Sequence, residues 1–363
     1  MKFVFQYARA TLCIIFIAGS IATAQDLQQQ LSKLGREAAI GYTAPILSGW
    51  GNDLNSGIYY SADLHNVLGF DIGVNLATSK ITNADKTYAI PSISLDPATI
   101  GITSVNVSGQ NKAIPVGTKI TLISGINFSP TTTNSAVGSK DNTVVKTIGG
   151  SSVVISSSDP SLNGKIITLP VQSQQILTLP GGYDLGSVGL GGVPLVAPQL
   201  ALGLPFGLEV MGRWIPPIKT DQGKFTNMGF GLRYDIDQWI PFCPVDIAIH
   251  FMTQKLTFKS NSDQDIFTGK ATAYGVAISK KLFILTLYSG FQIESSSLIL
   301  NDYTSYDSET GQSIFVQGFE INGNDKSRFT VGARLLLFFI NLHADYSFAA
   351  NNVLTLGAGI TIR

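Results

Sequence analysis

The stretch FGLRYDID, residues 230–237, alternates between large apolar side chains and small or charged ones. A period of two is that of a β-strand, whose successive side chains point to opposite faces. The stretch therefore predicts a strand with one polar face and one apolar face, the latter formed by Phe230, Leu232, Tyr234 and Ile236. Two architectures use such a strand. In a soluble sandwich the apolar face packs on a protein core, and in a membrane barrel it faces lipid.

The same alternation recurs through much of the chain. It predicts a hairpin at 56–78 with a tight turn at 65–67, and a series of strands that begins near residue 203. In that series the alternating positions that mark the strands lie at 206–214, 224–237, 245–258, 274–278, 283–293, 329–339, 342–348 and 354–362. A first strand at 37–47 and one returning strand within 79–200 bring the total to about twelve, and counts from ten to fourteen fit the pattern.

The first 24 residues predict a cleaved export signal. Lys2 and Arg9 precede an apolar core at 10–18, and Ala22-Thr23-Ala24 forms the small-x-small pattern of a cleavage site. The apolar core is too short to span a bilayer as a helix. A membrane anchor made from the same residues is the alternative interpretation.

The composition is unusual for a soluble domain. Charged residues make up 13% of the chain, against roughly 25% in an average domain. After the signal, no run approaches the ~18 apolar residues of a membrane helix. Loss of Lys2 and Arg9 leaves a slightly acidic chain, which excludes nucleic acid as a partner, and leaves Cys243 without a disulfide partner. An exported, hydrophobic chain without membrane helices is typical of an outer-membrane β-barrel.

Three further observations favour lipid over a protein core. The strands are about nine to fourteen residues long, which suits a tilted membrane span. Inner faces carry charges of both signs, as a polar lumen requires. Aromatic residues cluster near strand ends like an interfacial girdle, namely Trp214, Trp239, Phe242 and Phe339. We therefore predict an all-β protein, an antiparallel transmembrane β-barrel in the outer membrane of a Gram-negative bacterium. A soluble secreted β-protein is the alternative.

The predicted organisation has three parts. Residues 1–24 are the signal peptide, and 25–36 form a short periplasmic helical segment with leucines at helical spacing. Residues 37–363 form the barrel, interrupted at 79–200 by a largely extracellular insertion rich in Ser, Thr and Gly. The insertion contains short β-rich runs, so a small separate domain and a mostly disordered loop are both open.

Three stretches resemble an uncharacterised family of outer-membrane barrel proteins from Bacteroidota-type bacteria. They are AAIGYTAPILSGWGNDLNSGIYYSADLHNVLGFDIGV (38–74), LTLPGGYDLGSVGLGGVPLVAPQLALGLPFGLEVMGRWIPP (177–217) and the final LHADYSF…LGAGITIR (342–363). This resemblance implies a fold and a location but no activity. More distantly, a small N-terminal segment before a barrel is similar to long-chain fatty-acid transporters of the FadL type, which implies a small hydrophobic ligand. The chain ends at Arg363, whereas many such barrels end in an aromatic residue that the barrel-assembly machinery recognises.

The charged and histidine side chains predicted to face the lumen are the candidate site residues. They either form a constriction that orients a ligand or pair across strands to fill the lumen. The candidates are Glu209, Arg213, Arg233, Asp235, Asp237, Asp246, His250, Glu294, Arg334, His343 and Asp345. No catalytic residue, cofactor or metal site is predicted, because no metal-ligand spacing or phosphate-binding loop is present. His65 lies in the predicted turn and is expected to be solvated.

His343 and Asp345 share one face of their predicted strand, and a His–Asp pair is half of a hydrolytic site. Ser347 shares that face, but a separation of two strand residues is about 7 Å, too far for a direct His–Ser hydrogen bond. The alternative is a polar network inside the lumen.

The functional expectation is a non-enzymatic outer-membrane barrel in contact with outer-membrane lipid, assembled by the barrel-assembly machinery, that passes or binds a small hydrophobic molecule. The alternative is a structural or adhesive barrel that binds a partner through 79–200. A third hypothesis is a lipid-directed hydrolase that uses His343 and Asp345.

Overall fold

The computed structural model describes residues 36–185, 191–220, 223–260, 263–306 and 313–362. The predicted signal peptide lies outside these residues, as does all but the last residue of the helical segment predicted at 25–36. The described chain forms two compact units. One comprises 44–81 and the residues from 185 onward, and the other comprises 37–43 and 82–184.

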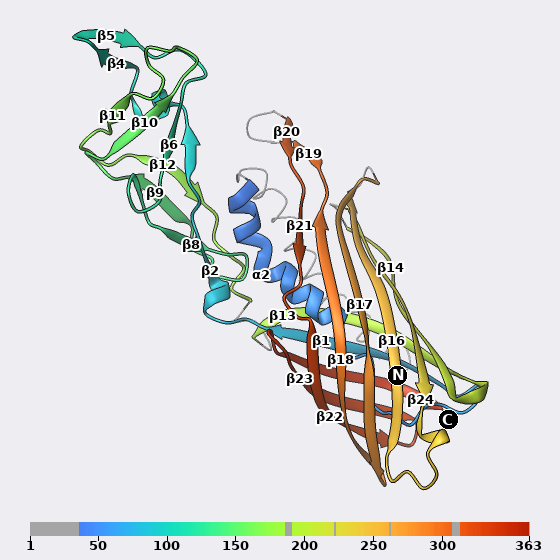
Figure 1. Cartoon of the computed structure of the whole chain (residues 1–363). Helices are drawn as coiled ribbons and strands as arrows, with labels where there is room; N and C mark the ends of the chain where they lie inside the picture. Colours follow the sequence, from blue (N-terminus) through green and yellow to red (C-terminus); the bar gives the residue numbers. More distant parts are fainter. Residues whose placement is uncertain (1–35, 186–190, 221–222, 261–262, 307–312, 363) are drawn as a thin grey trace, which may run out of the picture. The chain divides into compact units, whose positions relative to one another are not determined.

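The first unit is a closed barrel of ten antiparallel strands (Figure 1). Each strand pairs with the next one in the barrel, and β24 closes the ring on β1. The strands are β1 (Phe70–Lys80), β13 (Gly192–Leu204), β14 (Leu208–Thr220), β15 (Gly223–Asp235), β16 (Asp246–Ser260), β17 (Asp265–Leu282), β18 (Leu285–Leu300), β22 (Ser327–Leu337), β23 (Ile340–Phe348) and β24 (Val353–Ile362). The prediction of an antiparallel transmembrane barrel is confirmed.

Three short strands extend this framework. β21 (Phe319–Asn322) pairs with the last residues of β18, on the same edge that β22 occupies further along β18. β19 (Tyr303–Tyr306) pairs with β20 (Ser313–Val316). The 3-10 turns η4 (Pro205–Gly207) and η5 (Asp237–Trp239) lie between barrel strands.

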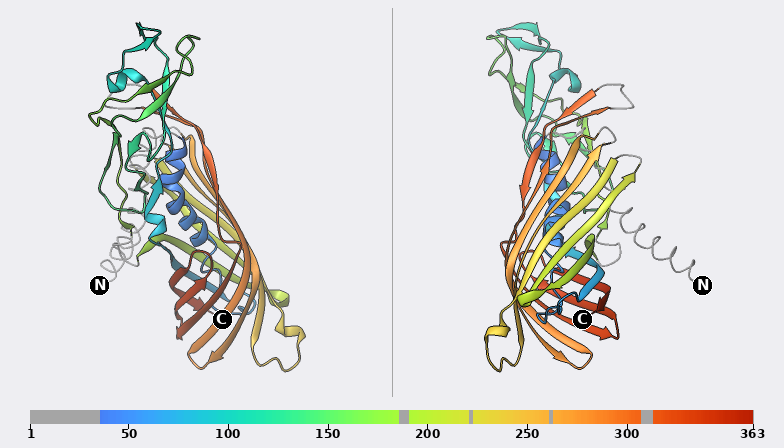
Figure 2. Two further views of the ribbon diagram at one scale, coloured as in Figure 1. Left: turned by 60° about the vertical axis from the view of Figure 1, so that its left-hand side comes forward. Right: turned by 90° about the vertical axis from the view of Figure 1, so that its right-hand side faces the viewer.

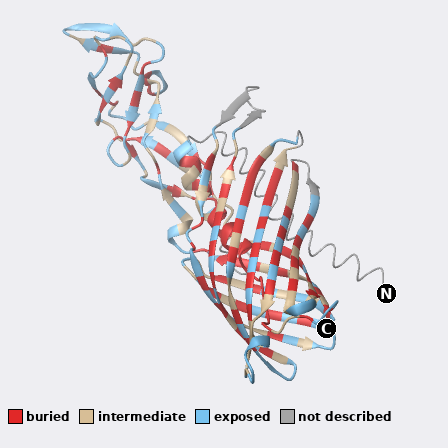
Figure 3. Cartoon of the chain, turned by 45° about the vertical axis from the view of Figure 1, so that its right-hand side comes forward, coloured by how far each residue is buried: buried red, intermediate tan, exposed pale blue. Residues whose placement is uncertain are grey.

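Strand β15 shows why the wall separates two environments. Phe230 and Leu232 are exposed on the outer surface, whereas Gly231 and Arg233 are buried inside the barrel. The strand ends at Asp235, so the last two residues of FGLRYDID belong to the turn. The same alternation of buried and exposed positions runs along the other strands (Figure 3). The outer wall is therefore apolar, as lipid requires.

Ten strands is the lower end of the predicted range, and both surplus strands lie near the N-terminus. Residues predicted as a strand at 37–47 are part of helix α2 (Arg36–Leu54), and residues 57–69 form no strand before β1 begins. Because two strands are lost together, the barrel keeps the even count on which the turn pattern depends.

Helix α2 lacks the one-sided apolar stripe of a surface helix because the barrel wall surrounds its second half. A Cβ at Gly49 would lie 2.8 Å from Val193 of β13, and one at Gly51 would lie 2.5 Å from Ser296 Oγ of β18. Figure 2 shows the tilted strands with α2 running into the barrel. Within the described residues, no helix is long and apolar enough to cross a membrane.

The second unit is a folded β-module, which excludes the mostly disordered loop. Its sheets have the orders β11-β10-β6-β3 and β12-β9-β7, with two-stranded pairs β2–β8 and β4–β5. The strands are β2 (Thr87–Ala89), β3 (Ile93–Leu95), β4 (Ser104–Val107), β5 (Gln110–Ala113), β6 (Lys119–Leu122), β7 (Phe128–Ser129), β8 (Thr132–Asn134), β9 (Thr143–Thr147), β10 (Ser152–Ser156), β11 (Ile166–Thr168) and β12 (Gln175–Leu179), with 3-10 turns η1 (Ala84–Lys86) and η2 (Pro97–Ile100). Ile120, Leu122, Phe128 and Val145 are fully buried and form its core.

The orientation of β15 predicts the effect of a charge on the outer wall. Leu232→Arg places a guanidinium against lipid and should lower the free energy of unfolding by about 2–4 kcal/mol if the position lies near the bilayer midplane. Urea unfolding of the barrel in phospholipid vesicles measures the change. The control is Val116→Arg, at a fully exposed valine of the second unit, which should leave the barrel transition unchanged. Equal effects of the two substitutions would contradict a lipid-facing wall.

Candidate functional site

The barrel lumen is occupied by residues 44–65, here called the luminal segment. Near one end of the barrel, Trp50 packs edge-on against Phe267 at the start of β17, with ring centroids 5.9 Å apart. At the opposite end, the His65 ring lies 2.6 Å from the Glu209 carboxylate at the start of β14. Because β14 and β17 start at opposite ends of the barrel, the luminal segment traverses the whole lumen.

Two arginines of the wall bind the C-terminal end of α2. Arg213 donates to the carbonyl oxygens of Leu54 (2.7 Å) and Ser56 (2.6 Å), and Arg328 donates to that of Asn52 (2.9 Å). The last carbonyls of a helix have no partner within the helix and carry the negative end of its dipole. Fully buried guanidinium groups satisfy both the hydrogen bonds and the charge.

Amide side chains of the wall satisfy the carbonyls that follow the helix. A buried backbone without regular structure needs such external donors, since water is excluded. Gln292 donates to the carbonyl of Asn55 (2.9 Å), Asn75 to that of Gly57 (2.9 Å), and Gln199 to that of Ile58 (3.3 Å).

Glu209 connects the wall to the far end of the luminal segment. One carboxylate oxygen accepts from Arg233 at 2.9 Å, and the other contacts His65 Nδ1 at 2.6 Å and accepts from the His65 amide at 3.2 Å. Arg233 in turn donates to the carbonyl of Ser61. The three side chains are buried, so removal of one partner would leave an uncompensated charge in the lumen. A second buried ion pair joins Arg328 and Glu294 at 2.7 Å.

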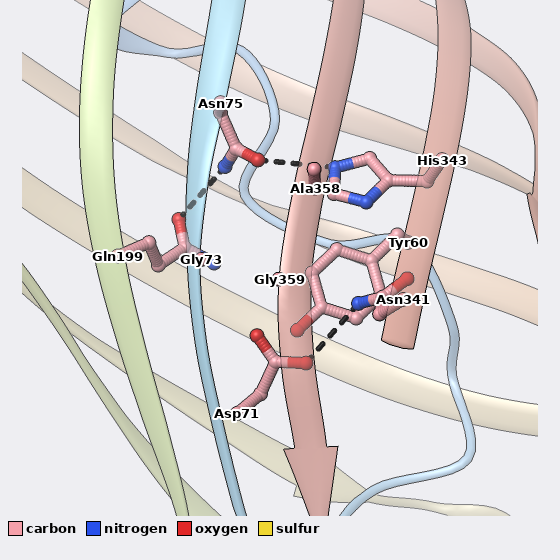
Figure 4. A pocket seen from close by; sticks show the side chains of 9 residues that line it. All are labelled: Tyr60, Asp71, Gly73, Asn75, Gln199, Asn341, His343, Ala358 and Gly359. Carbon is pink, nitrogen blue, oxygen red and sulfur yellow. Dashed lines mark hydrogen bonds between the residues drawn. The ribbon is translucent and has the colours of Figure 1, made fainter. Parts of the chain in front are cut away.

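Tyr60 lines a polar pocket on the β23–β24–β1 side of the lumen (Figure 4). Its ring stacks on His343 with centroids 4.4 Å apart, and the Arg334 guanidinium lies 5.0 Å from the ring centroid. Asp71 accepts from Asn341 at 3.1 Å. The pocket leaves no room for a water-sized molecule. Tyr60 thus packs directly against the polar side chains of the wall at this site.

Small residues of the wall make room for Tyr59. A Cβ at Gly290 would lie 2.2 Å from the Tyr59 hydroxyl, and the wall residues Ala248, Ala273 and Ala277 belong to the same buried cluster. The Tyr59 ring lies 4.8 Å from the ring of His250. The wall and the luminal segment are thus complementary in shape as well as in charge.

The structure divides the eleven candidate site residues into two groups. Eight are buried in the lumen, namely Glu209, Arg213, Arg233, His250, Glu294, Arg334, His343 and Asp345. The other three, Asp235, Asp237 and Asp246, are half-buried at the turn between β15 and β16. There Asp237 accepts from the amide of Ile247 at 2.6 Å, which is a local turn contact.

His343 and Asp345 are bonded to different partners. The His343 Nε2 atom lies 3.0 Å from Asn75 Oδ1, and Asp345 accepts from the Tyr288 hydroxyl at 3.0 Å. Ser347 is paired with Thr330 at 2.9 Å. This arrangement is the polar network that the sequence allows as the alternative to a hydrolytic pair. In the part of the chain that the structure describes, no group of three or more His, Cys, Asp or Glu could hold a metal ion.

Two residues of the network were outside the prediction. The expectation that His65 is solvated is wrong, because the luminal segment carries it into the barrel, where it is 8% exposed. Arg328 precedes the strand predicted at 329–339, and extending that alternation by one residue places it on the inner face. No local pattern distinguishes the wall amides Asn75, Gln199 and Gln292 from other polar inward residues.

Residues 1–362 match the model of a family described as "Family of unknown function (DUF6588)", and the chain belongs to this family. No curated protein matches the sequence. The match bears neither on the predicted Bacteroidota-type origin nor on the distant similarity to FadL-type transporters, which stay predictions.

Several solved structures are similar in fold at very low sequence identity. The β domain of the Bordetella autotransporter BrkA is 9% identical with a TM-score of 0.30, over 81% of this chain and 100% of that one. The translocator domain of the autotransporter NalP from Neisseria meningitidis is 9% identical with a TM-score of 0.29, over 86% and 93%. A loop-deletion mutant of OmpT, an outer membrane protein of Vibrio cholerae, is 10% identical with a TM-score of 0.23, over 81% and 99%.

The role of Arg213 gives a testable prediction. In Arg213→Met the Leu54 carbonyl keeps its bond from Gln254, but the Ser56 carbonyl loses its donor and the Gln199 side-chain oxygen loses its 2.8 Å bond. One buried unsatisfied acceptor costs about 1–3 kcal/mol, so the urea midpoint of the barrel should fall by at least that amount. The control is Lys259→Met, which removes the half-exposed Lys259–Asp265 pair and should cost about 0–1 kcal/mol. Equal midpoints for the two variants would contradict a buried, structural Arg213.

The contact between α2 and β13 gives a second prediction, in which a Gly→Ala substitution within a helix lowers the stability of the protein. Gly→Ala inside an isolated helix stabilises it by about 1 kcal/mol. At Gly49 the new Cβ would meet the Cβ and a methyl group of Val193 at 2.8 Å, so Gly49→Ala should instead destabilise the barrel by about 1–3 kcal/mol. Adding Val193→Gly should restore part of the loss. Gly212→Ala is the control, because no atom lies within 4 Å of its Cβ position. Stabilisation by Gly49→Ala would mean that α2 is not packed against the wall.

Proposed function

We propose that this member of the DUF6588 family is a closed outer-membrane β-barrel that anchors the 82–184 module at the cell surface, where the module binds a partner. The observation that carries the proposal is the occupied lumen, since the luminal segment is bonded to the wall at both ends and in the middle. This is the structural or adhesive alternative from the sequence, and the lumen contacts favour it over conduction.

The contents of the lumen do not suit passage of a small hydrophobic molecule. Such a molecule would have to displace the luminal segment and break the hydrogen bonds that Arg213, Arg328 and Glu209 make to it. A hydrophobic molecule could not replace these bonds, and a buried polar group that loses a hydrogen bond is costly. The geometry therefore supports a barrel that is closed in its resting state.

The connectivity supports a surface location for the module. It joins the end of β1 to the start of β13, at the barrel end opposite the short turns at 205–207, 283–284 and 338–339. In outer-membrane barrels the short turns face the periplasm and the long connections face outward. The 82–184 module should accordingly be extracellular.

The surface chemistry of the module suits an uncharged partner. Residues 82–184 contain six lysines and five aspartates, with no arginine or glutamate, so electrostatic attraction to a polyanion would be weak. Val154 and Ile166 pair across β10 and β11 and are 55% and 69% exposed. Together they offer a small apolar surface among hydroxyl side chains, which fits a neutral glycan or a polar protein surface.

A second candidate function is uptake of a small hydrophobic molecule after displacement of the luminal segment. One observation supports this candidate: among the described residues, the buried side-chain amide of Asn227 on the inner face of β15 has no hydrogen-bond partner. Groups of this kind are usually hydrated, and water beside the segment would ease its movement.

Replacement of residues 82–184 by a short Gly-Ser linker tests both candidates. The closed barrel should still form, as judged by faster migration of the unboiled sample on a gel, while cell adhesion to surfaces and matrix glycans is lost. Val154→Asp with Ile166→Asp should reproduce the adhesion loss, and Val116→Asp should not. Unchanged adhesion would contradict the proposal. Altered uptake of fatty-acid-like compounds with unchanged adhesion would favour the second candidate.

A further inference from the structure

Five large apolar residues at the short-turn end of the barrel have positive φ angles. This end contains the residues that precede β1 and the turns that follow β13, β15, β17 and β22. The five residues are Leu68 (67°), Phe206 (67°), Phe242 (58°), Phe283 (59°) and Phe338 (56°). We call them the turn ring.

The fold alone does not require these residues. A positive φ is unfavourable for a bulky side chain, and tight hairpin turns usually place Gly, Asn or Asp there. Phe283 follows Leu282, which pairs with Leu285, and Phe338 follows Leu337, which pairs with Ile340. Both are two-residue turns that glycine or asparagine would form with less strain.

Packing inside the protein does not compensate for this strain. The exposure of the turn ring ranges from 74% for Leu68 to 103% for Phe242. Side chains exposed to this extent bury almost no surface against the chain. Whatever stabilises them must come from outside the protein.

The turn ring is continuous with the lipid-facing wall. Leu282 and Ile284 flank Phe283 and are 49% and 42% exposed, while Leu337 and Phe339 flank Phe338 and are 43% and 55% exposed. Both two-residue turns and the residues that immediately precede them are thus apolar. A surface of this kind suits a bilayer better than water.

Lys280 indicates where the hydrocarbon ends. It lies on the outer face of β17, in phase with Tyr274 and Ile278, and its ammonium group donates to the carbonyl of Pro244 in the neighbouring turn. A lysine on the lipid face is tolerated close to the interface and not at the bilayer centre. Phe283 lies three residues further along a tilted strand, about 7 Å beyond this level. The interfacial layer on each side of a bilayer is about 5–8 Å thick, so Phe283 reaches the headgroups without leaving the membrane.

We propose that the turn ring binds the phospholipid surface, with its five side chains inserted in the interfacial layer of the leaflet at the short-turn end. Aromatic rings are favoured in that layer. Trp239, in the same turn as Phe242, donates to the Tyr234 hydroxyl at 2.7 Å and extends the aromatic surface. By the turn rule for outer-membrane barrels, this is the periplasmic leaflet.

The test places a fluorescent reporter at the turn ring of the full-length barrel in phosphatidylcholine vesicles. In a background with Trp50, Trp214 and Trp239 changed to Phe, Phe283→Trp and Phe338→Trp each give a single indole. We expect blue-shifted emission, quenched most strongly by phosphatidylcholine brominated close to the headgroup and weakly by aqueous acrylamide. Emission typical of water, quenched by acrylamide and not by brominated lipid, would overturn the proposal and leave a protein partner or no partner.

Asparagine substitutions provide an independent test, because they should change the urea midpoint in opposite directions depending on whether the rings lie in water or in the membrane interface. Phe283→Asn and Phe338→Asn relieve the positive φ, so they should raise the urea midpoint of the barrel in vesicles if the rings stand in water. If the rings lie in the interface, the midpoint should fall despite the relief. Ser108→Asn, at a positive φ in the second unit, is the control, and the barrel transition should not change. A raised midpoint in both asparagine variants would overturn the proposal even if the tryptophan variants failed to fold.

Discussion

A helix that ends inside a barrel leaves carbonyl groups that neither water nor lipid can satisfy, and the rest of the lumen is organised around this constraint. Arg213 and Arg328 supply the donors for the C-terminal carbonyls of α2. Their charges must then be balanced in a closed space. Glu294 pairs with Arg328, while Arg213 is balanced by the negative end of the helix dipole and by carbonyl oxygens. The wall therefore needs fixed polar residues at positions that an open pore would leave free to vary.

Each barrel strand faces two environments, lipid outside and the luminal segment inside. The outer side requires apolar residues. The inner side requires polar residues that also leave space for the luminal segment. Gly290 opposes Tyr59, and Gly49 of the segment opposes Val193. These close approaches explain why many inward positions carry small residues, since larger ones would leave no space for the segment. The interior of this ten-stranded barrel is therefore packed as closely as a protein core, although many of its side chains are polar.

Strand alternation predicted the outer wall because lipid imposes a uniform requirement on it. Residues 230–234, β16 as far as Met252, and β23 follow the predicted phase. The same reasoning failed at 56–64. The alternation there predicted a strand of the barrel wall, but Tyr59, Tyr60 and their neighbours lie buried inside the lumen. It also failed at 37–47, where Gly41 and Pro45 obscure a helix that is contacted on several sides and so has no apolar stripe.

The site was predictable only in part, for a related reason. Alternation placed Glu209, Arg213 and Arg233 on the inner face, but it could not show whether they face water or a chain segment. Their partners in the luminal segment lie 144 to 172 residues away in sequence, because that segment precedes β1. Long-range complementarity of this kind leaves no periodic signal. A filled lumen and an open pore have the same strand pattern.

Amide hydrogen exchange of residues 55–65 in the folded barrel tests the central claim most directly. These residues belong to no helix or strand, yet the amide of Ala62 donates to Ser279 at 2.9 Å and that of His65 to Glu209 at 3.2 Å. The account predicts that both amides exchange as slowly as those of the barrel strands, because exchange requires the segment to leave the lumen. Exchange as fast as in the turn between β15 and β16 would show a solvated segment in an open pore, and the closed-barrel account would be wrong.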